Sequence, residues 1–490
     1  MHLLILVVFA SLLNLVSGCE EYAECTLPDG HVGLCYEKKC LRQVDEDPRK
    51  NLTLTIAVKY PETVLRNHGK TALYIRGNGL GLLWLKGKRL AKTGFDTWGI
   101  NITYEASPTG YQCQTCFDDA NLPNKKLEYR ILADDLDDML GANFAITFPV
   151  SQTSSYFGEK PTFTSYPWFF EKTGVITSYV LNSSYIGGER NITLYTPPSY
   201  NENTYKTYPT IFVFDLSLQL AKFFKRNFES PIYPHAVSEE YALIGFGDYK
   251  NDGLERGDLL TQDVSPFYFD CINGTFTDNC DGCIPAGITT NQTEFFRYLA
   301  NGCGKKSIVG GLGDNTLDFL EKEALTFANK LASSRLRTDN LGVMGYSLGG
   351  LMSCYAIWTR PHVFSLAACQ SPSFWWPYKD SSFDADFDFL NKTLKDPVFQ
   401  TNRPEQKIYL DAGGAENLDP FRLTQSTVEA ARIITSYKHY KLDKNVWVNV
   451  DPYKDHNFIE WAKRMGLALT TLLPAGGTTG MPSNEAAPVG

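Results

Sequence analysis

The sequence predicts an α/β fold built around a mostly parallel central sheet. Beyond about residue 170, short apolar strands alternate with helical stretches, which is the order of parallel strands joined by covering helices. Three strands, 210–214, 241–246 and 341–344, are apolar at nearly every position, as expected for strands buried on both faces. The chain has 490 residues, 43% of them hydrophobic, so it is long enough to bury the core that such a sheet needs.

The residues before this region follow a different pattern. Several stretches alternate apolar and polar side chains and are separated by glycine-containing turns. These stretches lie at 52–58, 72–76, 98–104, 127–132 and 143–148. We therefore predict a β-sandwich domain over residues 50–165, followed by the α/β domain over residues 170–470.

All twelve cysteines lie beyond residue 18, and their grouping predicts disulfide bonds. Four of them fall in residues 19–45, a segment too short to bury a core, which we expect to be held by two bridges of unknown connectivity. Four more lie in an insert from about residue 265 to 306, which we place outside the core. Cys354 and Cys369 form a separate pair.

A zinc site is the alternative for the insert, because Cys280-x-x-Cys283 is flanked by Cys271 and Cys303. Structural zinc sites more often pair two short Cys-x-x-Cys knuckles, and this segment contains one. The pattern therefore favours disulfides, and we predict no metal and no other cofactor.

The N-terminus predicts export from the cell. An apolar run from Leu3 to Val16 ends in the small residues Ser17 and Gly18, so we expect residues 1–18 to be a signal peptide. Residues 16–19 also resemble a bacterial lipoprotein box, which stays open as an alternative. Asn-x-Ser/Thr sequons favour a secreted glycoprotein, and they occur at Asn51, Asn101, Asn182, Asn191, Asn273, Asn291 and Asn391.

Charge and hydropathy exclude two classes of partner. The formal net charge is −9, so no general attraction draws the chain to phosphate backbones, and we expect no nucleic-acid binding. The apolar run near the N-terminus is too short to cross a bilayer and no comparable run follows it, so no membrane span is predicted. The Gly/Pro/Thr/Ser-rich tail, residues 475–490, is expected to be disordered.

The most specific local pattern is Gly345-Tyr346-Ser347-Leu348-Gly349, which lies between an apolar strand and an apolar helix. Gly-x-Ser-x-Gly in this position is typical of a nucleophile elbow, a tight turn that lifts a serine hydroxyl above the carboxyl edge of a sheet. Side chains at the two flanking glycines would collide with the neighbouring strand and helix. We therefore predict Ser347 as a nucleophile, with the Leu348 amide as one oxyanion donor.

A serine nucleophile needs a base, and in this arrangement the order along the chain is serine, acid, histidine. His362, His439 and His456 follow Ser347. His362 comes directly after the nucleophile helix, before any acid, and His439 lies in a Tyr/Lys-rich stretch. We choose His456, because it lies in the loop after the apolar strand 446–450.

The acid is expected after the preceding strand, 407–410. Glu416 stands in a glycine-rich loop from which a carboxylate can bend toward a histidine, and it is the preferred candidate. Asp411 continues the strand, and Asp419 lies further along the loop; both stay open as alternatives. The second oxyanion donor is expected from the loop after strand 211–214, from the backbone amide of Leu216 or Ser217.

These residues resemble the esterase D-like branch of the α/β-hydrolases, a group that includes enterobactin and related siderophore esterases, feruloyl esterases and acetyl-xylan esterases. The resemblance covers roughly residues 175–470 and is carried by the stretches 208–215, 256–259, 319–323, 345–350 and 371–376, with His456 and Trp461. It implies an α/β-hydrolase fold in which the loop Gly413–Glu416 supplies the third member of the triad. An N-terminal β-sandwich is also similar to some members of the group.

Three more residues are candidates for binding substrate. Arg256 could hold an anionic group of a substrate, and an ion pair or loop anchor is its alternative role. Trp375 and Trp376 could line an acyl or aromatic pocket, although paired tryptophans after a strand are equally typical of a core.

The sequence as a whole predicts a secreted serine esterase that acts on a small-molecule or carbohydrate ester without a cofactor. Siderophore lactones, acylated sugars and simple acyl esters all fit this pattern, and no oligomeric state is predicted. A catalytically silent extracellular binding or matrix protein on the same scaffold is the alternative from another class. Acyl transfer to an acceptor other than water would use the same residues.

Overall fold

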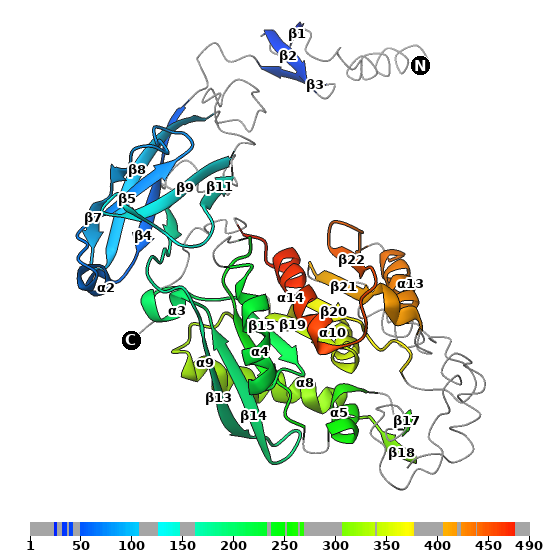
Figure 1. Cartoon of the computed structure of the whole chain (residues 1–490). Coiled ribbons are helices and arrows are strands. Elements are labelled where there is room, and N and C mark those ends of the chain that lie inside the picture. Colours follow the sequence, from blue (N-terminus) through cyan, green and yellow to red (C-terminus); the bar gives the residue numbers. More distant parts are fainter. Residues whose placement is uncertain are drawn as a thin grey trace, which may run out of the picture. The chain divides into compact units, whose positions relative to one another are not determined.

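Figure 1 shows the computed structural model of the chain. The chain divides into two compact units. One comprises residues 1–54 and 101–121, and the other comprises residues 55–100 and 122–490. The structure describes residues 24–26, 32–36, 39–42, 50–106, 126–147, 162–232, 237–249, 252–262, 265–268, 306–338, 341–376, 405–418, 423–437 and 439–475.

The largest sheet has eight strands in the order β13-β14-β16-β15-β19-β20-β21-β22. β14 pairs antiparallel with β13 and with β16, and the further pairs along this order are parallel. The strands are β13 (Val175–Asn182), β14 (Glu189–Thr196), β15 (Thr210–Phe214), β16 (Ala242–Phe246), β19 (Leu341–Tyr346), β20 (Phe364–Gln370), β21 (Lys407–Gly413) and β22 (Val446–Asp451).

Helices follow most of these strands. They are α3 (Ser199–Glu202), α4 (Leu218–Glu229), α5 (Asp252–Leu260), α8 (Gly313–Asp318), the π-helix η4 (Phe319–Ala324), α9 (Leu325–Leu331), α10 (Leu348–Thr359), the 3-10 helix η5 (Gly414–Leu418), α13 (Leu423–Thr435) and α14 (Phe458–Leu472). The predicted α/β-hydrolase-like fold is confirmed in outline. The large sheet is mostly parallel, as predicted, with antiparallel pairs at one end, and the chain forms several further, smaller sheets.

Side chains cover the large sheet on both faces. Phe212 and Phe214 of β15 belong to one hydrophobic cluster, which includes residues of α10 and α13. Ile211 and Val213 of the same strand belong to a second cluster, which includes residues of α4 and α14. Because successive strand residues point to opposite faces, the two clusters lie on opposite sides of the sheet. Every residue of β15, β16, β19 and β20 is buried, which accounts for their continuous apolar sequence.

The N-terminal region is built from smaller sheets. A five-stranded sheet has the order β10-β9-β5-β6 with β11 paired to β9, a four-stranded sheet has the order β12-β4-β8-β7, and a three-stranded sheet contains β1, β2 and β3. The strands predicted over residues 50–148 are present, whereas the packing of these sheets as a β-sandwich stays a prediction. The elements are β1 (Glu24–Thr26), β2 (Val32–Tyr36), β3 (Lys39–Arg42), β4 (Lys50–Lys59), α2 (Glu62–Asn67), β5 (Leu73–Gly77), β6 (Lys88–Arg89), β7 (Ala91–Gly94), β8 (Thr97–Ala106), β9 (Lys126–Ala133), β10 (Asp137–Asp138), β11 (Phe144–Thr147) and β12 (Thr162–Ser165).

Several predicted segments lie outside the described residues, namely the signal peptide, most of the cysteine-bearing insert and the tail beyond 475. The two ends of the insert pair as β17 (Ser265–Tyr268) and β18 (Lys306–Val309). Cys354 of α10 and Cys369 of β20 form a disulfide. Among the described helices, none is long and apolar enough to cross a membrane.

Candidate active site

Ser347 occupies the turn between β19 and α10. Its backbone angles are φ 59° and ψ −120°, a conformation that residues with side chains rarely adopt. The Ser347 amide donates to Gln370 O (3.0 Å), and the Ser373 amide donates to Ser347 O (3.0 Å). These two bonds hold the strained turn against the end of β20, and the Ser347 side chain remains partly exposed.

The glycines of the motif are required by close backbone contacts. A Cβ at Gly345 would lie 2.5 Å from Gly349 O, in the helix. A Cβ at Gly349 would lie 2.6 Å from Asp215 Oδ2 and 3.0 Å from Phe214 Cβ, at the end of β15. The distances of 2.5 and 2.6 Å are shorter than real Cβ contacts, so the collisions expected from the sequence are present on both sides of Ser347.

His456 and Glu416 lie side by side. His456 Nδ1 is 3.1 Å from Glu416 Oε2, with the imidazole 26% exposed and the carboxylate fully buried. An imidazole held through Nδ1 keeps Nε2 for a second partner, which is the arrangement of a triad base. Burial alone would raise the pKa of Glu416, but the hydrogen bond and charge of His456, with Ser371 and Arg464, outweigh it and lower that pKa.

Short loops after β21 and β22 bring these two side chains together. Glu416 lies in η5, immediately after β21. A Cβ at Gly413 would lie 2.1 Å from Lys454 O, so the absence of a side chain lets the histidine loop approach. The Ala415 amide donates to Lys454 O (3.1 Å), and Asn457 caps α14 directly after His456.

The other oxygen of Glu416 is bound by buried donors. Glu416 Oε1 accepts hydrogen bonds from Ser371 Oγ (2.8 Å), the Gly413 amide (2.9 Å) and Arg464 Nη2 (3.4 Å). Ser371 Oγ in turn accepts from Trp461 Nε1 (3.1 Å) and Arg464 Nη2 (2.7 Å). With Oε1 fixed in this way, Oε2 is directed at the imidazole.

The alternative acids have other positions. Asp411 is fully buried, lies 3.1 Å from Arg464 Nε and accepts from Gln370 Nε2 (3.1 Å). Burial, which Arg464 and Gln370 offset only in part, raises the pKa of Asp411 to about 6. Asp419 lies outside the described residues. Glu416 is therefore the candidate acid that contacts His456.

Aromatic rings connect the nucleophile turn to the histidine. Tyr346 stacks on Trp461, with ring centroids 4.3 Å apart and planes 11° from parallel. Trp461 meets the His456 ring edge to face at 4.6 Å. The residue before Ser347 and the imidazole thus contact the same indole, which places the two parts of the site next to each other.

The Ser347 hydroxyl has a different partner in this structure. Ser347 Oγ is 3.3 Å from Ser373 Oγ, and the described residues show no hydrogen bond between Ser347 and His456. Catalytic hydrogen bonds are often absent or long in free enzymes and form only when substrate is bound.

The predicted second oxyanion loop is attached to the nucleophile turn. Tyr346 Oη donates to Asp215 O (2.8 Å), and the Asp215 carboxylate packs against Gly349. The amides of Leu216 and Ser217 would lie 2.6 and 2.8 Å from a Cβ at Gly247. Because Gly247 has no side chain, the loop can approach the end of β16. The loop that carries both candidate amides is therefore held beside Ser347.

Arg256 is occupied by an ion pair. Its Nε and Nη2 each lie 2.7 Å from an oxygen of Asp215, and Nη2 also donates to Tyr346 O (3.3 Å). Burial alone would lower the pKa of Arg256, but the charge and hydrogen bonds of Asp215 raise it. In this structure Arg256 anchors the loop that carries the predicted oxyanion amides, which is the alternative role expected from the sequence.

The two adjacent tryptophans, Trp375 and Trp376, differ in how deeply they are buried. Trp376 is 2% exposed and belongs to the hydrophobic cluster that contains α10, whereas Trp375 is partly buried and packs against that cluster.

The two other candidate histidines lie away from Glu416. His362 has a 69% exposed side chain near Glu321, and His439 is exposed.

The contacts of Ser371, Ser373 and Arg464 were not predicted from the sequence. Ser371 and Ser373 belong to the stretch 371–376 that carries part of the family resemblance, which was a usable signal. Arg464 lies one turn beyond Trp461 on α14, and no local pattern distinguishes it from an exposed helical arginine. Its 3% exposure depends on how α14 packs against the sheet.

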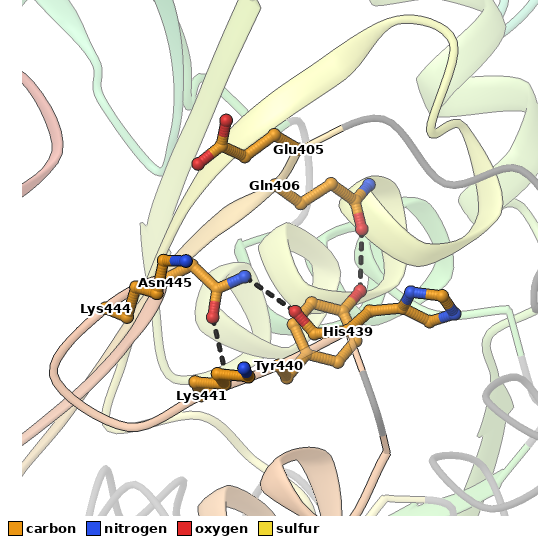
Figure 2. A pocket seen from close by; sticks show the side chains of 7 residues that line it. All are labelled: Glu405, Gln406, His439, Tyr440, Lys441, Lys444 and Asn445. Atoms are coloured by element: carbon orange, nitrogen blue, oxygen red, sulfur yellow. Dashed lines mark hydrogen bonds between the residues drawn. The ribbon is translucent and has the colours of Figure 1, made fainter. Parts of the chain in front are cut away.

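A cavity of about 360 Å³ lies at the opposite edge of the same strands (Figure 2). Its lining residues precede β21 and β22, whereas Glu416 and His456 follow those strands, so it is separate from the candidate active site. Figure 2 also shows Tyr440 Oη donating to Gln406 Oε1 (2.6 Å) inside this cavity. The lining consists of Glu405, Gln406, His439, Tyr440, Lys441, Lys444 and Asn445.

Solved structures similar to this chain include the three that follow. The siderophore hydrolase EstA from Aspergillus nidulans is 15% identical, covers 60% of this chain and 91% of its own, and has a TM-score of 0.43. The BES protein from Bacillus cereus is 17% identical, covers 61% of this chain and 96% of its own, and has a TM-score of 0.43. The enterobactin esterase FES from Shigella flexneri is 13% identical, covers 88% of this chain and 95% of its own, and has a TM-score of 0.40.

No curated protein matches the chain. The family model described as "Putative esterase" matches residues 305–472, the segment that contains Ser347, Glu416 and His456. This match agrees with the resemblance found in the sequence over about a third of the chain.

Proposed function

We propose that the protein is a serine esterase that hydrolyses a carboxylic ester through an acyl-enzyme intermediate. The contact between His456 Nδ1 and the buried Glu416 carboxylate (3.1 Å) carries this proposal, because it pairs a base with an orienting acid beside a serine in a strained strand-to-helix turn. The match to the esterase family supports the same reaction class.

The first half of the reaction acylates the enzyme. Ser347 Oγ turns from Ser373 toward His456, gives its proton to Nε2 and attacks the ester carbonyl carbon. The negative charge that develops on the carbonyl oxygen is held by the Leu348 amide and by the amide of Leu216 or Ser217. The bond between the acyl carbon and the alcohol oxygen then breaks, and His456 returns the proton to the leaving alcohol.

Water completes the cycle. His456 takes a proton from a water molecule, whose oxygen attacks the acyl carbon bound to Ser347. The serine–acyl bond breaks, the proton passes back to Ser347 Oγ, and a carboxylic acid leaves. Glu416, whose pKa is lowered by its neighbours, stays ionised and stabilises the imidazolium that forms twice in each cycle.

We also propose that the protein is secreted and glycosylated. Asn101, Asn182 and Asn191 are exposed, which is what glycan attachment requires. The Cys354–Cys369 disulfide is consistent with an oxidising compartment. The remaining sequon asparagines lie outside the residues whose exposure is described.

A substrate panel tests the reaction. Purified protein is assayed against a siderophore lactone, an acylated sugar and a simple acyl ester, alongside Ser347→Ala. Hydrolysis of at least one ester, lost in the variant, is expected. A folded protein that hydrolyses none of them and does not react with a fluorophosphonate would instead support the catalytically silent binding role. Product analysis with an added alcohol distinguishes hydrolysis from acyl transfer.

A further inference from the structure

Arg464 lies between two buried carboxylates. It projects from α14 and is 3% exposed. Its Nε is 3.1 Å from Asp411 Oδ1, and its Nη2 is 3.4 Å from Glu416 Oε1. The same Nη2 donates to Ser371 Oγ (2.7 Å), which in turn donates to Glu416 Oε1 (2.8 Å). One guanidinium therefore reaches the candidate acid both directly and through a hydroxyl.

This arrangement divides one positive charge between two negative groups. Two buried carboxylates near one another cannot both ionise easily unless a cation offsets their repulsion. The pKa of Asp411 is raised and that of Glu416 is lowered, so the shared environment favours the ionised form of the residue that contacts His456.

We propose that Arg464 is a positioning residue that keeps Glu416 ionised and directs its Oε2 at His456, while Asp411 competes for the same guanidinium. The inference rests on the proposed triad and deepens it. It assigns to Asp411 the role of a counter-charge, where the sequence left it as an alternative acid.

Described residues of several elements contribute the polar and titratable groups next to this pair. From β20, Gln370 contributes an uncharged donor to Asp411. From β21, burial and the charge of Asp411 raise the pKa of Tyr409, which keeps its phenol neutral. Lys454 approaches with its backbone carbonyl, and its ammonium lies 3.5 Å from Glu460. His456 is the titratable group in contact with the other oxygen of Glu416, Oε2.

The test is the pH dependence of the rate at which a fluorophosphonate labels Ser347. The acid limb of this profile is the pH range in which the labelling rate falls as the Glu416–His456 pair takes up a proton. Arg464→Gln removes the positive charge, so the pair binds a proton more readily, and the midpoint of the acid limb moves to a pH about one unit higher. Asp411→Asn leaves Arg464 with a single carboxylate, so the acid limb moves down. The downward shift is the smaller one, because Asp411 already takes up a proton near pH 6.

Two further variants separate charge from packing. Arg464→Lys keeps the charge but loses the fork that reaches two carboxylates, so the labelling rate falls while the acid limb stays near its wild-type position. Lys206→Gln is the matched control, since Lys206 is a mostly buried cation 2.5 Å from the buried Glu240, just before β16. It is expected to lower stability and to leave the acid limb unmoved.

Opposite shifts of the acid limb in Arg464→Gln and Asp411→Asn support the inference. Unmoved limbs in both variants, or shifts of the same sign, would overturn it while leaving the esterase proposal intact. If Arg464→Gln does not fold, the downward shift in Asp411→Asn decides the question alone. A wild-type protein that is never labelled would refute the esterase proposal, and with it this role for Arg464.

Discussion

The two sides of the candidate active site are held in place by different kinds of contact. On the nucleophile side, backbone and glycine contacts fix the turn, as at Gly345 and Gly349, where any side chain would collide with the helix or with β15. On the acid–base side, buried polar side chains from distant parts of the chain do the same work, namely Ser371, Trp461 and Arg464. A short local motif therefore reveals the first side, whereas only the folded chain reveals the second.

The largest expected effect comes from removing the charge of the acid. Glu416→Gln keeps the shape of the side chain but leaves the imidazolium without its anionic partner, so the rate of ester hydrolysis should fall by about 10⁴-fold. Asp411→Asn and Asp419→Asn test the alternative acids at pH 8, and each is expected to cost less than about tenfold. A larger loss in either than in Glu416→Gln would move the acid to that residue.

A smaller effect is expected on the nucleophile side. In Gly349→Ala the new methyl group would lie 2.6 Å from Asp215 Oδ2, and the Arg256 ion pair prevents that carboxylate from moving away. We expect a loss of about 2 kcal/mol in the free energy of unfolding and a rate lower by about 10²-fold. Gly94→Ala is the matched control, because its Cβ would make an ordinary 3.9 Å contact. Equal behaviour of the two variants would show that the turn tolerates a side chain.

The smallest effect on rate should come from the disulfide that joins the two sides. Cys354 lies in the nucleophile helix α10, and Cys369 lies near the end of β20, just before Ser371. The double variant Cys354→Ala/Cys369→Ala opens a 15-residue loop and should lower the free energy of unfolding by about 3 kcal/mol. The labelling rate at low temperature should stay within about twofold of the wild-type rate, because hydrogen bonds still hold Ser347 to β20. A large drop in rate without unfolding would mean that the bond positions the site directly.

The central strands of the fold could be predicted closely. The apolar run predicted at 210–214 is β15 with the same bounds, because a strand buried on both faces shows its burial directly in composition. The hairpin at the start of the large sheet was predicted, but the antiparallel pairing of β14 with β16 was not, because the pairing direction of strands distant in sequence depends on how they meet in the fold. The two small strands at the ends of the insert were also missed.

For the site, the placement of residues after strands was the useful signal. His456 and Glu416 were selected because each follows the carboxyl end of a strand, and the structure brings them within 3.1 Å. The roles of Ser371 and Arg464 could not be inferred in this way. They depend on the burial of single side chains against α14, which periodicity does not resolve.

Mapping the fluorophosphonate adduct by mass spectrometry tests the central claim most directly. Ser347 and Ser373 have hydroxyls 3.3 Å apart, so both are within reach of a reagent that enters the site. A single adduct on Ser347, formed rapidly in the wild-type protein and at least about 10³-fold more slowly in His456→Ala, is the predicted result. An adduct on Ser373, or labelling of Ser347 that does not depend on His456, would contradict the triad.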